Sequence, residues 1–291
     1  NVGVKTAAAQ NMVAIGFIEK MLGTSVTWLD WLIAAAPWSI FMTIALYFIM
    51  TRMLPPETEE IAGGQEAIRG ELAKLGPTTA AEYKLMAISV SLLFLWATEK
   101  VLHPFDTSTT TLAAIALMFL PGIGIMDWKA AQAKIPWGTI LLFGVGISLG
   151  TALLQTKAAT WLSTLLVSGL GLQQASTLFI LLALTVFLVL IHLGFASATA
   201  LASAMIPIVI TVLQQVKTPG INIVGMTLLL QFVVSFGFIL PVNAPQNMVA
   251  YGTDTFTSRD FVRTGLVITV VAVALLVVMA LTYWRWLGYV G

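Results

Sequence analysis

Long apolar stretches separated by short polar segments make up most of this sequence. The stretches run over residues 28–51, 85–102, 107–125, 137–154, 221–240 and 264–284. A helix of about 20 apolar residues crosses a hydrocarbon core of about 30 Å. The pattern therefore predicts an all-α, polytopic membrane protein.

One apolar stretch is too long for a single crossing. Residues 175–213 contain His192 as their only titratable group. As one helix, 39 residues would be about 58 Å long, nearly twice the hydrocarbon thickness. The stretch must fold back, most naturally at 194–199. Two full spans and a re-entrant hairpin both fit this pattern.

A polar segment, Arg52–Lys84, separates the chain into parts. Pro55 and Pro56 stop one helix, and Gly76-Pro77 stop a short amphipathic one. Lys and Arg residues favour a cytoplasmic position for this segment. We divide the chain into 1–54, the end of a first repeat; 55–84, a cytoplasmic loop; and 85–291, a second repeat. The second repeat would contain a hairpin at about 175–213 and an unwound helix at about 221–256.

The division rests on a repeated motif. Q-N-M-V-A-x-G occurs at 10–16 and again at 246–252, and a Thr-x-x-Asp pair follows each copy, at Thr27 and at Thr257. Asparagine, glutamine and proline are costly at membrane depth unless the backbone lines a protein cavity. Two interrupted apolar segments in matching positions indicate the binding site of a secondary transporter built from inverted repeats.

Composition narrows the function further. The chain is 58% hydrophobic and 9% charged, with a mean hydropathy of +0.95, which excludes a soluble domain. There is no cysteine, and two histidines make a metal site unexpected. We find no catalytic pairing and no basic patch, so we expect neither an enzyme nor a nucleic-acid partner. Because the sequence opens inside a half-repeat, we expect it to be the C-terminal portion of a longer protein.

Several segments together resemble the divalent anion:sodium symporter family, which carries di- and tricarboxylates. Phe195–Thr199, followed by Ile206-Pro207, resembles the tip of its second hairpin. Asn243–Asn247 and Ala7–Asn11 resemble its two unwound loops, and the segments 136–139 and 70–72 also fit. The resemblance implies a re-entrant hairpin, unwound transmembrane helices and a homodimer in the bacterial inner membrane. It also implies an elevator mechanism, with a fixed scaffold and a moving transport domain.

The resemblance also implies the substrate-binding residues, namely Gln10, Asn11, Ser197, Thr199, Asn243, Pro245 and Asn247. A dianion at mid-membrane needs hydrogen-bond donors and positive potential. Half-helix N-termini supply both, and Lys5 and His192 could compensate the charge. The alternatives are small residues that ease a turn, a Lys5 that extends to the interface, and a structural, hydrogen-bonded His192. Gln231 and Ser235 carry a weaker signal for the same path.

Two departures from the family pattern bear on the transport mode. Ala198 stands where the family has a hairpin asparagine, and Ala7–Ala9 stand where it has glycine and proline, with Lys5 just before them. We therefore expect exchange without sodium, as in citrate/succinate or tartrate/succinate antiporters, and no cofactor. The alternatives are a sodium-coupled dicarboxylate symporter, which would bind Na⁺, a membrane-embedded enzyme and a structural subunit. The sequence leaves the carboxylate itself open.

Overall fold

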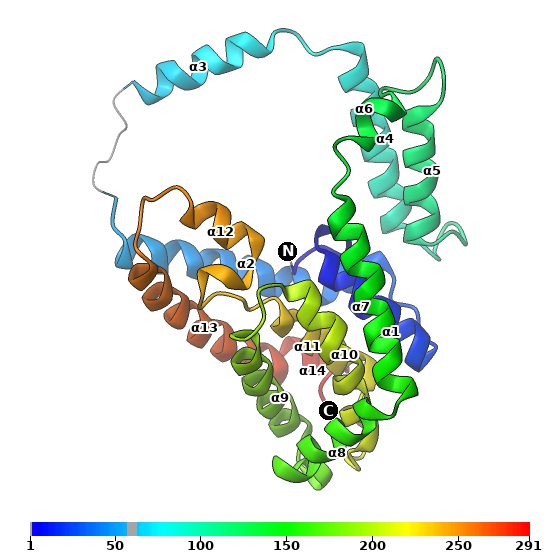
Figure 1. The fold of residues 1–291 in the computed structure, drawn as a ribbon, viewed down its shortest axis with the longest axis vertical. Coiled ribbons are helices and arrows are strands. Elements are labelled where there is room, and N and C mark those ends of the chain that lie inside the picture. The colour runs from blue at the N-terminus through cyan, green and yellow to red at the C-terminus, as the bar shows by residue number, and fades with distance from the viewer. Residues whose placement is uncertain (1, 57–62) are drawn as a thin grey trace. The chain divides into compact units, whose positions relative to one another are not determined.

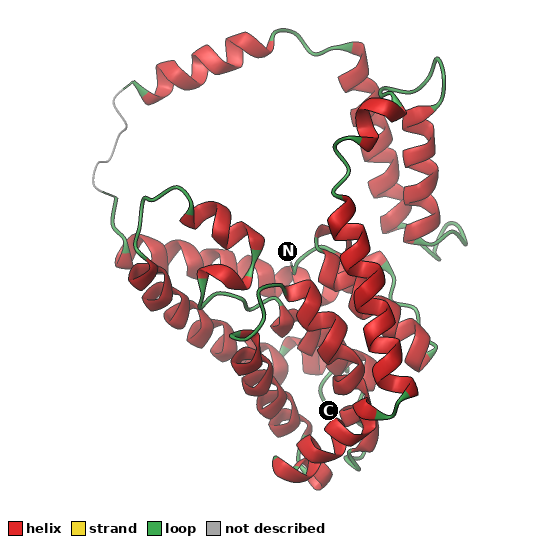
Figure 2. Ribbon diagram, viewed as in Figure 1, coloured by secondary structure: helices red, strands yellow, loops and turns green. Residues whose placement is uncertain are grey.

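The computed structural model describes residues 2–56 and 63–291, and its regular elements in these ranges are all helical (Figures 1 and 2). Its longer helices are α1 Ala9–Leu22, α2 Trp28–Met53, α3 Gly64–Leu75, α4 Ala80–Ala97, α5 Thr107–Phe119, α7 Trp137–Gln155, α8 Ala158–Gly169, α9 Thr177–His192, α10 Ala198–Gln215, α11 Ile223–Val234 and α13 Ser258–Leu281. The shorter ones are η1 Lys5–Ala7, α6 Trp128–Gln132, η2 Leu172–Gln174, η3 Pro241–Asn243, α12 Pro245–Tyr251 and α14 Tyr283–Trp286. The all-α prediction is confirmed.

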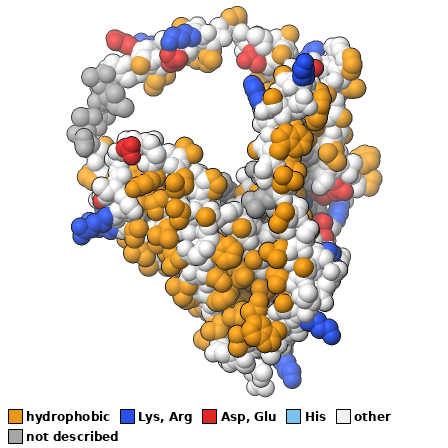
Figure 3. All heavy atoms as spheres, in the orientation of Figure 1, with side chains coloured by type: hydrophobic (Ala, Val, Ile, Leu, Met, Phe, Trp, Pro, Cys, Tyr) orange, Lys and Arg blue, Asp and Glu red, His pale blue; other side chains and the backbone are white. Residues whose placement is uncertain are grey.

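Among the described residues, four helical segments are long and apolar enough to cross a membrane. They are α2, α4, α10 and the segment Ser258–Trp286. Large apolar side chains also lie on the outside of these helices, for example Val90 and Phe94 of α4, which are 66% and 59% exposed. Figure 3 shows hydrophobic side chains over much of the visible face. Such a surface suits lipid rather than water, so the chain is a polytopic integral membrane protein.

The chain forms two compact units. The first contains residues 1–26, 30–49 and 137–291, and the second contains residues 27–29 and 50–136. These units are defined by how the helices pack. The division predicted from the sequence, at residues 54 and 84, is defined by the repeated motif and by a polar loop. Residues 57–62 of the predicted loop lie outside the described residues.

Helix α10 is the centre of the first unit, where it packs against α1, α7, α8 and α11. Two glycines of α7 allow neighbouring helices to approach closely. A Cβ at Gly146 would collide with the side chain of Ser203, and one at Gly150 would collide with the ring of Phe17. A Cβ at Gly144 would meet open space, so Gly146 and Gly150 serve helix packing and Gly144 does not.

Residues 175–213 fold back as their length requires. Helices α9 and α10 are separated by a turn at 193–197. With 16 and 18 residues, the two helices are about 24 and 27 Å long. Helix α9 is thus shorter than the typical hydrocarbon core of about 30 Å, whereas α10 is one of the helices long and apolar enough to cross it.

In the second unit, α4 packs against α5. Helix α4 begins with a capping box between Thr79 and Glu82. A buried carboxylate, Glu99, follows its end. Glu99 Oε2 accepts hydrogen bonds from the backbone N–H of Trp28 (3.1 Å) and from the hydroxyl of Thr107 (2.8 Å). It thereby joins the first turn of α2, which is distant in sequence, to the start of α5.

Candidate functional site

The repeated motif adopts the same local structure twice. In each copy a three-residue 3₁₀ helix is followed by one extended residue, and an α-helix then begins. The extended residues are Ala8, with φ −147° and ψ 141°, and Ala244, with φ −149° and ψ 144°. Both apolar segments are thus interrupted at corresponding positions, and the sequence repeat is also a repeat of backbone conformation.

The asparagines of the motif make matching hydrogen bonds. Asn11 donates its side-chain amide to the carbonyl of Val4 (3.3 Å), and Asn247 donates to the carbonyl of Leu240 (3.4 Å), seven residues earlier in each case. Asn247 also donates to the carbonyl of Gly237 (2.7 Å). Each asparagine lies in the first turn of its helix and binds the chain that precedes the break.

Both broken segments bind the end of α11. Gln10 donates to the hydroxyl of Ser235 (3.3 Å), and Gln231 donates to the amide oxygen of Asn11 (3.4 Å). In the second copy, Asn247 binds Gly237. The two motifs, 236 residues apart in sequence, are therefore hydrogen-bonded to one short stretch, residues 231–237.

Asn243 connects the second broken segment to the turn between α9 and α10. Its amide nitrogen donates to the carbonyls of His192 (2.8 Å) and Phe195 (2.9 Å), and its oxygen accepts from the N–H of Leu240 (3.1 Å). The side chain is buried. Because both amide hydrogens bind protein carbonyls, Asn243 positions the turn in this structure rather than offering a donor to a ligand.

The predicted hairpin residues lie at the start of α10. Ser197 caps the helix by accepting from the N–H of Ala200 (3.4 Å). Thr199 is buried, and its carbonyl accepts from Ser203 (2.9 Å). Pro245 is exposed and is the first residue of α12.

Lys5 and His192 are both buried but differ in their contacts. The ammonium of Lys5 donates to the carbonyl of Val26 (2.7 Å). His192 is 2% exposed, and neither of its ring nitrogens has a hydrogen-bond partner among the described residues. Its ring lies against Gly237, where a Cβ would be 2.9 Å from Cε1. No hydrogen bond of regular geometry from the described residues holds the ring, which lies close to the backbone of Asn243, and the structural alternative for His192 stays a prediction.

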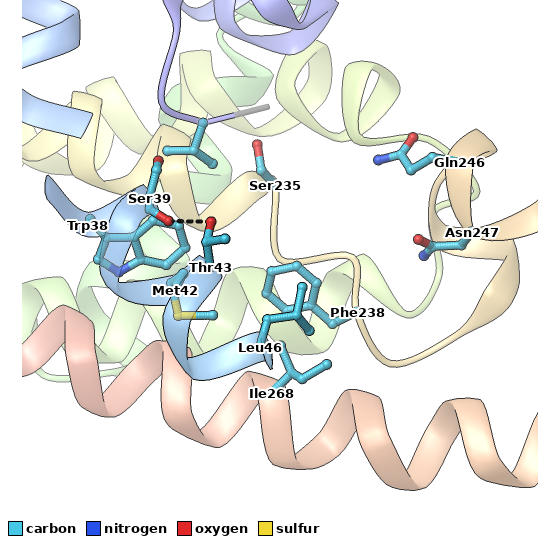
Figure 4. A pocket seen from close by; sticks show the side chains of 11 residues that line it. Trp38, Ser39, Met42, Thr43, Leu46, Ser235, Phe238, Gln246, Asn247 and Ile268 are labelled. Carbon is cyan, nitrogen blue, oxygen red and sulfur yellow. Dashed lines mark hydrogen bonds between the residues drawn. The ribbon is translucent and has the colours of Figure 1, made fainter. Parts of the chain in front are cut away.

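A pocket of about 350 Å³ lies beside the second broken segment (Figure 4). Its polar lining comes from Ser39, Thr43, Ser235, Gln246 and Asn247. Its apolar lining comes from Val2, Trp38, Met42, Leu46, Phe238 and Ile268. In Figure 4 the side chains from α2 face those from α12 across this space. Sequence reasoning missed the α2 residues, because single hydroxyls in an apolar span carry no distinguishing pattern.

Aromatic rings form one wall of this pocket. Trp38 stacks on Phe236, with ring centres 5.2 Å apart and planes at 8°. Phe236 in turn stacks on Phe238 at 5.5 Å and 24°. The stack joins α2 to the loop that precedes η3, so it supports both the pocket and the second broken segment.

Two helix breaks of the same backbone conformation, both hydrogen-bonded to residues 231–237 beside a largely apolar pocket, thus occur in a polytopic membrane protein. The chain belongs to the family described as the sodium:sulfate symporter transmembrane region, whose profile matches residues 1–290. The family resemblance inferred from the motifs is confirmed.

The curated relatives agree with this assignment. The chain is 55% identical over 291 residues to a "Membrane protein" of Cupriavidus necator, covering 100% of the chain and 56% of that protein. It is 24% identical to the sodium-dependent dicarboxylate transporter SdcS of Staphylococcus saprophyticus (91% and 52% covered). It is 26% identical to the L-tartrate/succinate antiporter of Escherichia coli K12 (96% and 56% covered). The chain thus spans about half the length of the curated relatives it matches.

Proposed function

We propose that this chain forms part of a secondary active transporter of di- and tricarboxylates, which works by anion exchange with alternating access. Two of the relatives named above are described as a sodium-dependent dicarboxylate transporter and an L-tartrate/succinate antiporter. The single observation that carries the proposal is the pair of matching helix breaks bound to residues 231–237. Irregular backbone at membrane depth is tolerated where it lines a cavity, which is the arrangement a midplane binding site requires.

In this proposal the two repeats are inverted in the membrane, and α9 and α10 form a re-entrant hairpin. Helix α9, about 24 Å long, is shorter than a typical span, whereas α10 is long enough to cross, so the hairpin rests on the family resemblance and on the turn at 193–197. Asn243 then holds the tip against the unwound segment. Such a contact would let the tip and the second broken segment act as one binding surface.

The substrate anion would bind between the start of α10 and the broken segments. Helix α10 has 18 residues, so its first N–H groups and its dipole favour a carboxylate near Ser197 and Thr199. Gln10, Asn11, Pro245 and Asn247 shape the broken segments around that site. The indole ring of Trp38 lines the pocket, but its N–H is buried and does not reach that space.

Charge compensation favours exchange over symport. Lys5 is a buried cation close to the first helix break, and a protonated His192 would be a second. Moving buried positive charge across the bilayer core is costly, and a bound dianion would lower that cost. Sodium-coupled symport is the alternative, and the sodium-dependent relative favours it.

The two compact units suit an elevator mechanism. The first unit holds both broken segments and α9–α10, and would be the moving transport domain. The second, with α4 and α5, would be the fixed scaffold and would contribute to a homodimer. We place the protein in the bacterial inner membrane.

Counterflow in proteoliposomes tests this function. Vesicles loaded with succinate, malate, tartrate or citrate should take up labelled succinate without a Na⁺ gradient, and empty vesicles should not. Uptake by empty vesicles that depends on a Na⁺ gradient would instead support symport. Lys5→Ala should abolish exchange or permit uniport, whereas Lys20→Ala, which removes an exposed lysine bound to Thr151, should leave exchange intact. Unchanged exchange in Lys5→Ala would overturn the charge-compensation argument.

A further inference from the structure

The hydroxyl groups that α2 contributes to the pocket already donate their hydrogens to backbone carbonyls of the same helix. Ser39 donates to the carbonyl of Ala35 (2.9 Å), and Thr43 donates to the carbonyl of Ser39 (2.8 Å). A hydroxyl whose hydrogen is donated can only accept further hydrogen bonds. The α2 side of the pocket therefore presents lone pairs, and these two hydroxyls have no hydrogen left for a ligand.

The position of Ser39 is fixed from behind. A Cβ on Gly3 would lie 3.0 Å from Ser39 Oγ, so the backbone of the first segment is in close contact with this side chain. The adjacent carbonyl of Val2 accepts from the indole N–H of Trp31 (2.8 Å), which holds the same segment on α2. Ser39 is therefore confined on one side and faces the pocket on the other.

The opposite side of the pocket differs. Ser235 accepts from Gln10, so its own hydrogen is available to a ligand. Gln246 is exposed and carries both a donor and an acceptor. Both amide hydrogens of Asn247 are committed to carbonyls, so it adds an acceptor. The side of the pocket formed by α11 and α12 thus offers hydrogen-bond donors. The hydroxyls of α2 offer only acceptors.

We propose that the α2 hydroxyls select substrates that carry a hydrogen-bond donor on the carbon chain, that is, hydroxycarboxylates over plain dicarboxylates. This inference rests on the proposed transport of carboxylates and names the substrate class within it. A carboxylate can only accept hydrogen bonds. Its oxygens would therefore be repelled by the lone pairs of the Ser39 and Thr43 hydroxyl oxygens. A ligand hydroxyl would instead donate to them, while its carboxylates bind the donor side.

The size of the pocket and the strength of one such bond set the expected effect. A space of about 350 Å³ accommodates a four-carbon acid with bound water. A hydrogen bond to a neutral group contributes on the order of 1 kcal/mol, which corresponds to roughly a fivefold to tenfold preference. The wild-type protein should therefore bind malate and tartrate several-fold more tightly than succinate.

Competition in the counterflow assay tests the inference. Succinate, malate and tartrate have the same carbon chain and carry no, one and two hydroxyls. Thr43→Val keeps the shape and removes the acceptor, so it should lower the ratio of malate to succinate affinity by about fivefold to tenfold. Ser39→Ala should act in the same direction, and binding in detergent should show the same change in ratio.

Thr211→Val is the matched control. Thr211 donates to the carbonyl of Pro207 within α10 in the same way (2.8 Å) but does not line the pocket. Its ratio should stay at the wild-type value. An unchanged ratio in both Thr43→Val and Ser39→Ala would overturn the inference while leaving carboxylate transport standing. Aspartate competing better than malate would also overturn it, because the α2 hydroxyls would then select an ammonium. Failure of counterflow with every acid would overturn the proposed function and this inference with it.

Discussion

Asn11 and Asn247 make the same hydrogen bond at equivalent places in the two repeats, each to the carbonyl seven residues before it. The donor–acceptor distances are 3.3 and 3.4 Å. Each of these carbonyls also accepts a backbone hydrogen bond, Val4 from the N–H of Ala7 and Leu240 from the N–H of Asn243, so the asparagine amide adds a second bond across the helix break. The repeated asparagine is therefore part of the reason why the chain can break twice in an apolar environment.

We expect Asn247→Ala to lower the free energy of unfolding by about 1–2 kcal/mol, because the carbonyl of Gly237 loses its side-chain partner and that of Leu240 keeps only the N–H of Asn243. Thermal unfolding in detergent measures this change. Gln246→Ala is the control, since the neighbouring side chain is exposed, and its midpoint should stay near that of the wild type. Equal midpoints for the two variants would argue against a stabilising role for the asparagine.

Asn243 allows a sharper comparison. Asn243→Ala removes three hydrogen bonds and should cost about 3 kcal/mol. Asn243→Asp should be worse, because a buried carboxylate would face the carbonyls of His192 and Phe195 instead of donating to them. Val242→Ala, at an exposed neighbouring position, should change the unfolding midpoint little. An aspartate variant more stable than the alanine variant would contradict the positioning role of Asn243.

Three glycines of α7 provide an internal control for helix packing. Gly146→Ala and Gly150→Ala should each cost about 1–3 kcal/mol, because the added methyl group would overlap Ser203 or Phe17. Gly144→Ala should stabilise the protein by about 0.5–1 kcal/mol, since alanine is the better helix former and the position is open. The unfolding midpoints of the three variants check the order, and a destabilising Gly144→Ala would oppose this account of the interface.

The sequence predicted the features that local chemistry controls. Apolar length predicted the spans α2, α4 and Ser258–Trp286 and the fold-back of residues 175–213, and the repeated motif predicted both helix breaks. The predicted stretches 107–125 and 221–240 contain shorter helices, α5 and α11, which are not among the four long enough to cross. The partners within the site were less predictable. That Asn243 would bind the turn after His192 depends on tertiary contact between segments about 50 residues apart. Nothing in the local sequence distinguishes this use of an asparagine from ligand binding.

The contribution of α2 to the pocket could not be predicted for a related reason. Ser39 and Thr43 sit in an apolar span, where hydroxyls usually bind the carbonyl four residues earlier, as these two do. What makes them notable is the space they face, which only the packing of α2 against the loop around Phe238 creates. The helix breaks can be predicted from the sequence, whereas the pocket beside them forms only through the packing of distant segments.

Glu99 should be important for the second unit. Glu99→Ala leaves the N–H of Trp28 without its acceptor and should cost about 2–3 kcal/mol. Glu99→Gln keeps an acceptor oxygen and should cost about 1 kcal/mol. Glu71→Ala, which removes an exposed ion pair with Lys74, should change the unfolding midpoint very little. Equal effects of Glu99→Ala and Glu71→Ala would exclude a structural role for the buried carboxylate.

We expect substitutions of His192 to affect stability and transport differently. A neutral imidazole always carries one N–H, and burying it without a partner costs about 1–3 kcal/mol. His192→Leu removes this cost at similar volume, so its unfolding midpoint should be equal to or higher than that of the wild type. If the ring carries a proton when the substrate binds, the same variant should lose exchange.

His192→Gln distinguishes a proton from a simple donor, because glutamine keeps an N–H but cannot take up a charge. We expect it to lose exchange as His192→Leu does, and this loss should persist at every pH between 5.5 and 8, roughly the range in which histidine titrates. Normal exchange in His192→Gln would mean that the buried ring serves only as a donor. A lower midpoint in His192→Leu would mean that the ring nitrogens have partners in the folded protein, and that its role is structural.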